Sequence, residues 1–279
     1  MTGADGLLGS VLRKQATIVT RRSEADISDL DALRSFAVRN PGITHIINCA
    51  AFSLVDLAES EREEAFKANA AGPENLGILA AEIGARVVHI STDYVFSGNL
   101  RRPLKEEDPT EPSSHYGITK LEGERRLLKA NPNACIIRTS WIFGRGGKNF
   151  IAKLFQMLLE KEELRLTNDH WNLPTYAPDL SDAILNMLDA SGIYHYANRG
   201  VATKYEFGLA LRDEAELAGF PIAAKRILAV PGSTFPTPAL RPVYSVLDAK
   251  KIERKLGKPA RPWREALREY VQESHGKTF

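Results

Sequence analysis

Short apolar segments alternate with longer segments of helical periodicity along the first half of the chain. The apolar segments are nearly continuous, which is typical of strands that are buried on both faces. Strands are predicted at residues 17–20, 43–48, 86–91 and 134–138, and helices at residues 28–40, 61–83 and 114–130. This alternation predicts an α/β fold built on a doubly wound parallel sheet of Rossmann-like architecture.

Local signals define several helix ends. Ser28 is the predicted N-cap of the first helix, and Gly84 is the predicted stop of the second. Thr203 and Glu206 have the spacing of a capping box, so another helix is predicted to begin there. Further helices are predicted at residues 149–161, 178–191, 248–256 and 263–274, beyond the point near residue 143 where the alternation becomes irregular. A proline-rich loop, residues 230–242, is expected to cover a cleft between two units.

The composition and charge of the chain argue against a nucleic-acid-binding or membrane-spanning protein. The chain has 279 residues, 43% hydrophobic and 26% charged, with a formal net charge of +2. This balance gives no strong basic field for nucleic acid. No apolar run approaches the roughly 20 residues that span a membrane, and the N-terminus has no signal-peptide pattern, so a cytoplasmic protein is expected. Cys49 and Cys135 lie in apolar segments, where two reduced, buried thiols are expected.

A glycine pattern, G-x-x-G-x-x-G, is formed by Gly3, Gly6 and Gly9. Such glycines let the backbone approach a pyrophosphate, and the helix that follows supplies N–H donors. The pattern is common by itself, so it is weak evidence alone. It also requires a preceding strand, and only Met1 and Thr2 precede it here. The first strand is therefore expected to be missing or truncated.

Candidate acid–base chemistry lies farther along the chain. Tyr116 and Lys120 have i, i+4 spacing and share one helix face. An ammonium beside a phenol lowers the pKa of the phenol toward neutral pH. Thr92 follows an apolar strand, at the sheet edge where ligands of α/β proteins bind. Each motif is common alone, but their order along one chain forms a complete constellation.

On these motifs the chain resembles the extended short-chain dehydrogenase/reductases and, within them, the dTDP-4-dehydrorhamnose reductases. The most specific segments are STDYVF at residues 91–96, YGITKLEGE at 116–124, RTSWIFG at 138–144, NDH at 168–170, PT at 174–175 and FPTPALRP at 235–242 with Ser245. The resemblance extends from Thr2 to about Ala266. It implies an NAD(P)-binding domain at residues 1–145 and, mainly, a smaller α/β substrate-binding cap at 146–279, with some segments returning to the sheet.

The resemblance also implies a role for each matching residue. Tyr116 would protonate the 4-keto oxygen of the sugar, Lys120 would lower the pKa of that tyrosine and hold the nicotinamide ribose, and Thr92 would polarise the ketone. The implied cofactor-binding residues are Gly3, Gly6, Leu7, Leu8, Arg21, Arg22, Asp26, Ile27, Cys49, Ala50, Ala51, Tyr116 and Lys120. The implied substrate-binding residues are Thr92, Tyr94, Trp141 and Arg241.

Two arginines bear on the choice of cofactor. Arg21 and Arg22 follow the second predicted strand, and no acidic residue stands there to receive a ribose 2′-hydroxyl. Two guanidinium groups suit a 2′-phosphate, so NADPH is favoured, with NADH as the other possibility. The alternative interpretation is a solvated pair of surface charges.

Some members of the family dimerise through a metal held by glutamates. Val11 and Pro178 stand here at two of those glutamate positions, and neither side chain can bind Mg²⁺. We therefore expect no structural metal and a monomer or a metal-independent dimer.

The leading functional hypothesis is NADPH-dependent reduction of a nucleotide-linked 4-keto sugar, dTDP-4-dehydro-6-deoxy-L-mannose, to dTDP-L-rhamnose. One alternative is a reductase or epimerase of another nucleotide sugar. The other is a non-catalytic NADP-binding regulatory subunit, like that of methionine adenosyltransferase.

Overall fold

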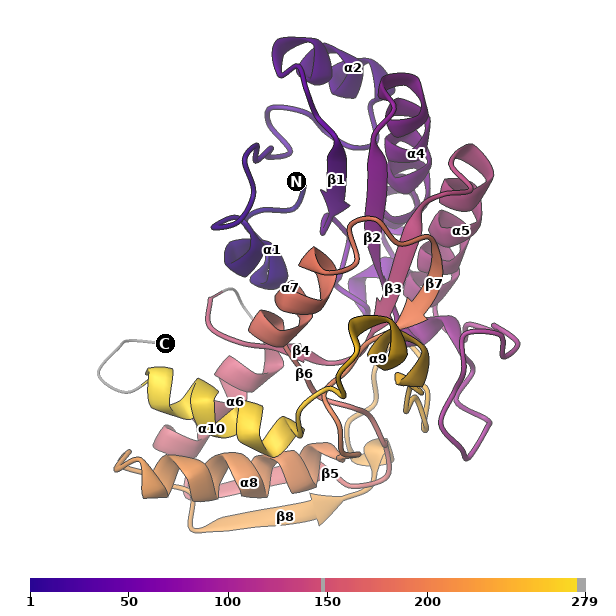
Figure 1. Ribbon diagram of the computed structural model, residues 1–279. Coiled ribbons are helices and arrows are strands. Elements are labelled where there is room, and N and C mark those ends of the chain that lie inside the picture. Colours follow the sequence, from indigo (N-terminus) through magenta and orange to yellow (C-terminus); the bar gives the residue numbers. More distant parts are fainter. Residues whose placement is uncertain (147–148, 275–279) are drawn as a thin grey trace.

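A four-stranded parallel sheet forms the centre of the first half in the computed structural model, which describes residues 1–146 and 149–274 (Figure 1). Residues 147–148 and 275–279 of the predicted cap lie outside the described residues. The strands lie in the order β1 (His45–Asn48), β2 (Arg86–Thr92), β3 (Cys135–Thr139) and β7 (Gly192–His195). Every neighbouring pair is parallel, as the unbroken apolar segments predict.

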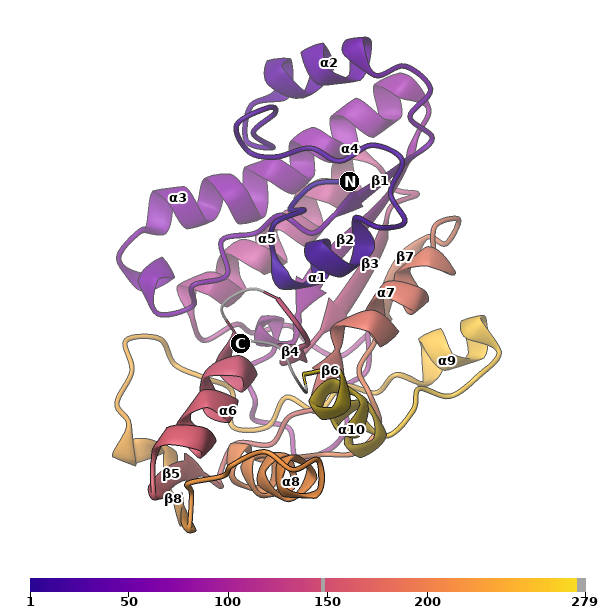
Figure 2. The ribbon, with the colours of Figure 1, turned by 90° about the vertical axis from the view of Figure 1, so that its left-hand side faces the viewer.

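Helices cover both faces of this sheet because successive strand residues point to opposite sides. Ile46, Val87 and Ile136 share one apolar core with α2 (Leu30–Arg39) and α4 (Gly72–Ile83). The next residue of each strand contributes to a second core with α1 (Leu7–Leu12) and α7 (Ala177–Leu185). Figure 2 shows the two sets of helices on opposite sides of the strands. The predicted doubly wound α/β fold is confirmed.

The first strand of the fold is represented by two residues. Thr2 forms a parallel bridge with Asn48, and its N–H donates to the Ile47 carbonyl at 3.0 Å. Met1 accepts from the Thr20 N–H at 3.0 Å, and the terminal amine donates to the Ile18 carbonyl at 2.6 Å. The predicted strand at 17–20 is wrong, because a two-residue neighbour offers this segment too few backbone partners to form a ladder.

Several helices depart from the sequence prediction, among them α7, which ends at Leu185 instead of the predicted residue 191. Asp29, not Ser28, is the N-cap of α2, because its carboxylate accepts from the Ala32 N–H. The Ser28 hydroxyl instead donates to Asp26 at 2.8 Å. The single helix predicted at 61–83 is α3 (Arg62–Phe66), a π-helical turn (Lys67–Ala71) and α4, which ends as predicted at Gly84 with φ 70°.

The cap holds a core of its own below the sheet in Figure 1. Its strands pair as β4 (Ile142–Phe143) with β6 (Thr175–Tyr176) and as β5 (Glu163–Thr167) with β8 (Arg226–Val230). Its helices are α6 (Phe150–Glu160), α8 (Lys204–Leu217) and α10 (Trp263–Ser274). The predicted capping box of Thr203 and Glu206 begins α8. By contrast, β7 is a strand of the large sheet, and α7 and α9 (Lys250–Leu256) pack against that sheet.

The helices found in the described part of the chain include none that is long and apolar enough to cross a membrane.

Val11 and Pro178 lie on α1 and α7, which pack against each other. Because neither side chain offers an oxygen to Mg²⁺, we predict that the oligomeric state is the same in excess EDTA and in millimolar Mg²⁺. Sedimentation velocity in the two conditions measures this directly. A dimer that separates in EDTA and returns with Mg²⁺ would show that other carboxylates bind the ion.

Candidate active site

The three predicted catalytic residues come together where β2 meets α5 (His115–Ala130). Thr92 is the last residue of β2, and Tyr116 and Lys120 lie on successive turns of α5. The Thr92 hydroxyl lies beside the hydroxyl of Tyr116, with which it interacts, and donates to Asp93 Oδ1 at 3.1 Å. It also accepts from the Tyr94 N–H at 3.2 Å. A phenol and a hydroxyl that lie side by side are positioned to bind one substrate oxygen together.

The start of α5 is fixed by close packing and by capping. The Ser114 side chain accepts from the Gly117 N–H, so the helix begins as the sequence predicts. A Cβ on Gly117 would lie 2.3 Å from the carbonyl oxygen of Tyr94. Only glycine therefore lets this turn of α5 reach the segment after β2, and this contact brings Tyr116 beside Thr92.

Tyr116 is a neutral acid in this structure. Burial raises the pKa of Tyr116 to about 12, while the interaction with Thr92 acts in the opposite direction. The lowering expected from Lys120 is not found. Lys120 Nζ instead donates to the Ile90 carbonyl at 2.7 Å and lies 3.3 Å from His89 Nε2. The lysine amine is held by β2 rather than by the tyrosine one turn away.

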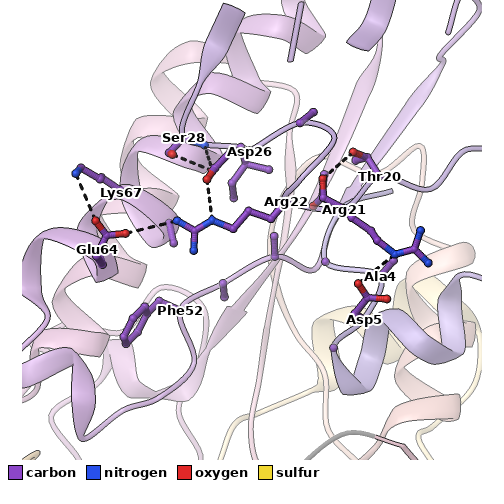
Figure 3. Close-up of a pocket in the computed structure, with 18 residues that line it drawn as sticks. Ala4, Asp5, Thr20, Arg21, Arg22, Asp26, Ser28, Phe52, Glu64 and Lys67 are labelled. Atoms are coloured by element: carbon purple, nitrogen blue, oxygen red, sulfur yellow. Dashed lines mark hydrogen bonds and ion pairs between the residues drawn. The ribbon is translucent and has the colours of Figure 1, made fainter. Parts of the chain in front are cut away.

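A cavity of about 250 Å³ adjoins the glycine motif (Figure 3). Among the predicted cofactor-binding residues, those that line it are Gly3, Gly6, Arg21, Arg22, Asp26, Ile27, Ala50 and Ala51. Leu7, Leu8, Cys49, Tyr116 and Lys120 do not line it. Leu7 and Leu8 begin α1 and pack toward the core of the sheet. Cys49 directly precedes the lining segment. The residue as a whole is half-buried, with its side chain packed against the core of the sheet, whereas Cys135 is buried, and both are free thiols.

Glycine is required at the floor of this cavity. Gly3 has φ 68°, and a Cβ there would lie 2.4 Å from the backbone nitrogen of Ala50. A Cβ on Gly9 would lie 2.0 Å from the Gly3 carbonyl oxygen. These contacts bring the glycine turn, α1 and the end of β1 together more closely than side chains would allow.

The two arginines are paired with carboxylates at the cavity rim. Arg21 Nε lies 3.3 Å from Asp5, and Arg22 Nε donates to Asp26 Oδ2 at 2.8 Å. Arg22 also lies 3.5 Å from Glu64, as Figure 3 shows. The carboxylate of Asp26, one of the predicted cofactor-binding residues, is thus engaged by Arg22 and Ser28. Asp5 and Glu64 were not predicted, since nothing in their local sequence indicates this pairing.

We predict that replacing Arg21 and Arg22 with alanine weakens NADPH binding about 10- to 100-fold and NADH binding much less. The reason is that charge-assisted hydrogen bonds to a 2′-phosphate contribute about 1.5–3 kcal/mol. Titration calorimetry with both cofactors measures the difference. The matched control replaces Arg165 and Arg226, two exposed arginines of the cap strands β5 and β8. Equal losses of affinity for NADPH and NADH would show that Arg21 and Arg22 are solvated surface charges that do not bind the 2′-phosphate.

Among the predicted substrate-binding residues, Tyr94 contacts Tyr116 directly. The Tyr94 ring meets the Tyr116 ring edge to face, with centroids 5.5 Å apart. Arg241 interacts with Tyr94 and forms a two-pronged ion pair with Asp56, at 3.0 and 2.7 Å. This pair joins the proline-rich loop to the segment after β1. Asp56 was not predicted, because its partner lies 185 residues away in the sequence.

Trp141 has an unusual backbone. Its φ of 44° is the one positive value among the non-glycine residues that the structure describes. A bulky residue in this region is strained by about 1–3 kcal/mol, and such strain concentrates at functional sites. The ring packs on Phe150 and Phe207, with centroids at 6.1 and 5.3 Å.

Asn69 supports the site and was missed by sequence reasoning. It is fully buried in the π-helical turn, where its amide accepts from the Phe52 N–H at 2.8 Å and donates to the Phe52 carbonyl and to Thr119. It thereby joins the cavity-lining segment to α5. The turn that presents Asn69 has no recognisable sequence signal, although π-turns occur often at functional sites.

Fold and site together define an NAD(P)-dependent oxidoreductase of the extended short-chain dehydrogenase/reductase class. Residues 1–275 match the family model described as the RmlD substrate binding domain, and the chain belongs to this family.

Relatives agree with this assignment over nearly the whole chain. The spore coat polysaccharide biosynthesis protein SpsK of Bacillus subtilis is 38% identical over 98% of this chain and 96% of its own. The dTDP-4-dehydrorhamnose reductase of Mycolicibacterium smegmatis is 38% identical over 100% of this chain and 86% of its own.

A solved dTDP-4-dehydrorhamnose reductase from Bacillus anthracis, in complex with NADP, superimposes with a TM-score of 0.90 at 30% identity, covering 98% of this chain and 97% of that one.

Proposed function

We propose that this protein reduces the 4-keto group of dTDP-4-dehydro-6-deoxy-L-mannose with NADPH and releases dTDP-L-rhamnose, a precursor of cell-surface polysaccharide. The observation that carries the proposal is the juxtaposition of the Thr92 and Tyr116 hydroxyls, one helical turn from Lys120. Several relatives that match most of this chain bear the name dTDP-4-dehydrorhamnose reductase, which supports the choice of substrate.

The residues at the cavity fit a dinucleotide. The glycine turn leaves its backbone open to a phosphate, and the rim carries the guanidinium groups of Arg21 and Arg22. NADPH, when bound, supplies the hydride for C4. Gly3, Gly6 and Ala50 would lie against its phosphates and middle part. The NADP complex of the Bacillus anthracis relative supports this cofactor.

In the proposed reaction the Thr92 and Tyr116 hydroxyls both bind the 4-keto oxygen. The Tyr116 phenol gives its proton to that oxygen as the alcohol forms, and Thr92 donates a hydrogen bond that stabilises the developing negative charge. An ammonium at Lys120 would stabilise the resulting phenolate. Tyr94 and Arg241 would hold the sugar nucleotide beside them, with Trp141 as a wall of the sugar pocket.

We also propose the division into a cofactor domain at residues 1–145 and a substrate cap within 146–279, from which α7, β7 and α9 return to the sheet. The proposed partner is the nucleotide-sugar substrate, with no nucleic acid or membrane, in a cytoplasmic monomer or metal-independent dimer.

The direct test is to incubate the protein with NADPH and dTDP-4-dehydro-6-deoxy-L-mannose. We expect stoichiometric oxidation of NADPH and formation of dTDP-L-rhamnose, identified by proton NMR. Parallel reactions with other nucleotide-linked 4-keto sugars measure selectivity. Faster turnover of another keto sugar would show that the proposed substrate is wrong. Cofactor binding without turnover of any keto sugar would contradict the proposal that the protein is an enzyme.

A further inference from the structure

A chain of buried side-chain contacts runs across three neighbouring segments to Lys120. The Thr2 hydroxyl donates to Asn48 Oδ1 at 2.7 Å, and Asn48 Nδ2 lies 2.9 Å from His89 Nδ1. On the far side of the ring, His89 Nε2 lies 3.3 Å from Lys120 Nζ. All four residues are at most 4% exposed. The imidazole thus links the end of β1 to the lysine of the candidate active site.

The backbone fixes which way each group in this chain faces. The Ala50 N–H can only donate, and it donates to Asn48 Oδ1 at 3.1 Å. The amide oxygen of Asn48 therefore faces Ala50 and Thr2, and its NH₂ group faces His89. Since that NH₂ donates, His89 Nδ1 must accept. Burial alone is the largest cause that holds the pKa of His89 well below its usual value, and a charged Lys120 would lower it further; the ring is therefore neutral and its proton lies on Nε2.

This tautomer decides which form of Lys120 fits. His89 Nε2–H points at Lys120 Nζ. Lys120 Nζ itself donates to the Ile90 carbonyl at 2.7 Å. An ammonium has no lone pair and would oppose one donor with another. A neutral amine satisfies both contacts, because it accepts from His89 and donates to Ile90.

The other groups around Lys120 do not supply a strong counter-charge. Glu124, one turn later on α5, is engaged by Arg138 at 2.7 Å and by the Ser91 hydroxyl. Burial raises the pKa of the Cys49 thiol to about 12, so it is uncharged at neutral pH. Burial lowers the pKa of Lys120 to about 8, and Glu124 and Cys49 oppose this only in part.

We infer that His89 is a positioning residue for Lys120. The Nε2–H of His89 donates to the neutral form of the lysine amine and, together with the Ile90 carbonyl, favours that form over the ammonium before cofactor binds. Given the proposed function, the phosphate charges of NADPH then favour the ammonium, so cofactor binding takes up a proton from solvent at Lys120. The chain from Thr2 to His89 orients this amine and is not a path for the proton, since His89 Nδ1 has no proton to pass on.

The inference is tested first on the protein without cofactor. Nitrogen-15 NMR of the His89 ring is expected to show a protonated Nε2 and a bare Nδ1, and the opposite tautomer would overturn the inference. Carbon-13 NMR then follows the titration of Lys120 Cε, with K120M to assign the signal. H89N keeps an oxygen acceptor for Asn48 and removes the donor to Lys120, so the pKa of Lys120 is expected to rise by about one unit.

The matched control is H45N, the same change at a partly exposed histidine of β1, which should leave the Lys120 titration unchanged. An identical Lys120 titration in H89N and the parent would overturn the inference.

The cofactor step is measured by calorimetry of NADPH binding in buffers of different ionisation enthalpy between pH 8 and 9.5, with K120M as the blank. We expect up to one proton taken up by the parent, and in H89N the loss of part of this uptake. NADPH that binds without proton uptake would overturn the coupling, whereas no NADPH binding at all would contradict the proposed function and leave the result for the free protein standing.

Discussion

Tyr116→Phe is expected to lower turnover about 10²–10⁴-fold and to leave NADPH affinity nearly unchanged. This is the range that a positioned general acid contributes, and the substitution removes only the hydroxyl that would protonate the 4-keto oxygen. The phenyl ring keeps the edge-to-face contact with Tyr94, so the surrounding packing should persist. Single-turnover kinetics with saturating cofactor measures the loss, and calorimetry measures the affinity.

A matched control is Tyr205→Phe, which removes a hydroxyl from a tyrosine on α8 that packs beside the cap core. It should retain the parental turnover. If Tyr116→Phe reduces the keto sugar at the parental rate, another group protonates the oxygen. A parallel loss of NADPH affinity would instead indicate damage to the fold around α5.

The sheet and its helices were predictable because their signals are local. Continuous apolar segments gave β1, β2 and β3, and capping side chains such as Ser114 and Thr203 gave the starts of α5 and α8. The strand prediction for residues 17–20 is wrong for a nonlocal reason. A strand needs a neighbouring strand as partner, and here the neighbour consists of Met1 and Thr2 alone. The π-turn was not predictable either, because it depends on how α5 packs against it through Asn69 and Thr119.

In the candidate site, too, the features that depend on local sequence were predictable and those that depend on distant segments were not. Helical spacing alone predicts that Tyr116 and Lys120 share one face of a helix. The position of Thr92 at the end of an apolar strand predicts that it lies at the ligand-binding edge of the sheet, near them. The direction of the Lys120 amine depends on His89 and Ile90, which belong to another element. The ion pair of Asp56 with Arg241 likewise joins distant segments, and one sequence contains no signal for it.

Arg138→Met is expected to lower the free energy of unfolding by about 3–5 kcal/mol, the typical cost of leaving one member of a buried ion pair without its partner. Arg138 on β3 and Glu124 on α5 are 2% exposed, and the guanidinium donates to both carboxylate oxygens at 2.7 to 3.2 Å. Urea denaturation measures the change. The double variant with Glu124→Met should recover much of the loss, because it removes the stranded carboxylate as well.

The exposed pair of Lys225 and Glu162 provides the control, since Lys225→Met should change stability little. The buried pair also bears on catalysis, because Glu124 lies one turn beyond Lys120 and anchors α5 to the sheet. We therefore expect Arg138→Met to lower turnover even in conditions where the variant is folded, and the double variant to regain part of it. A single variant as stable as its parent would show that water or the Ser91 hydroxyl alone can satisfy the carboxylate.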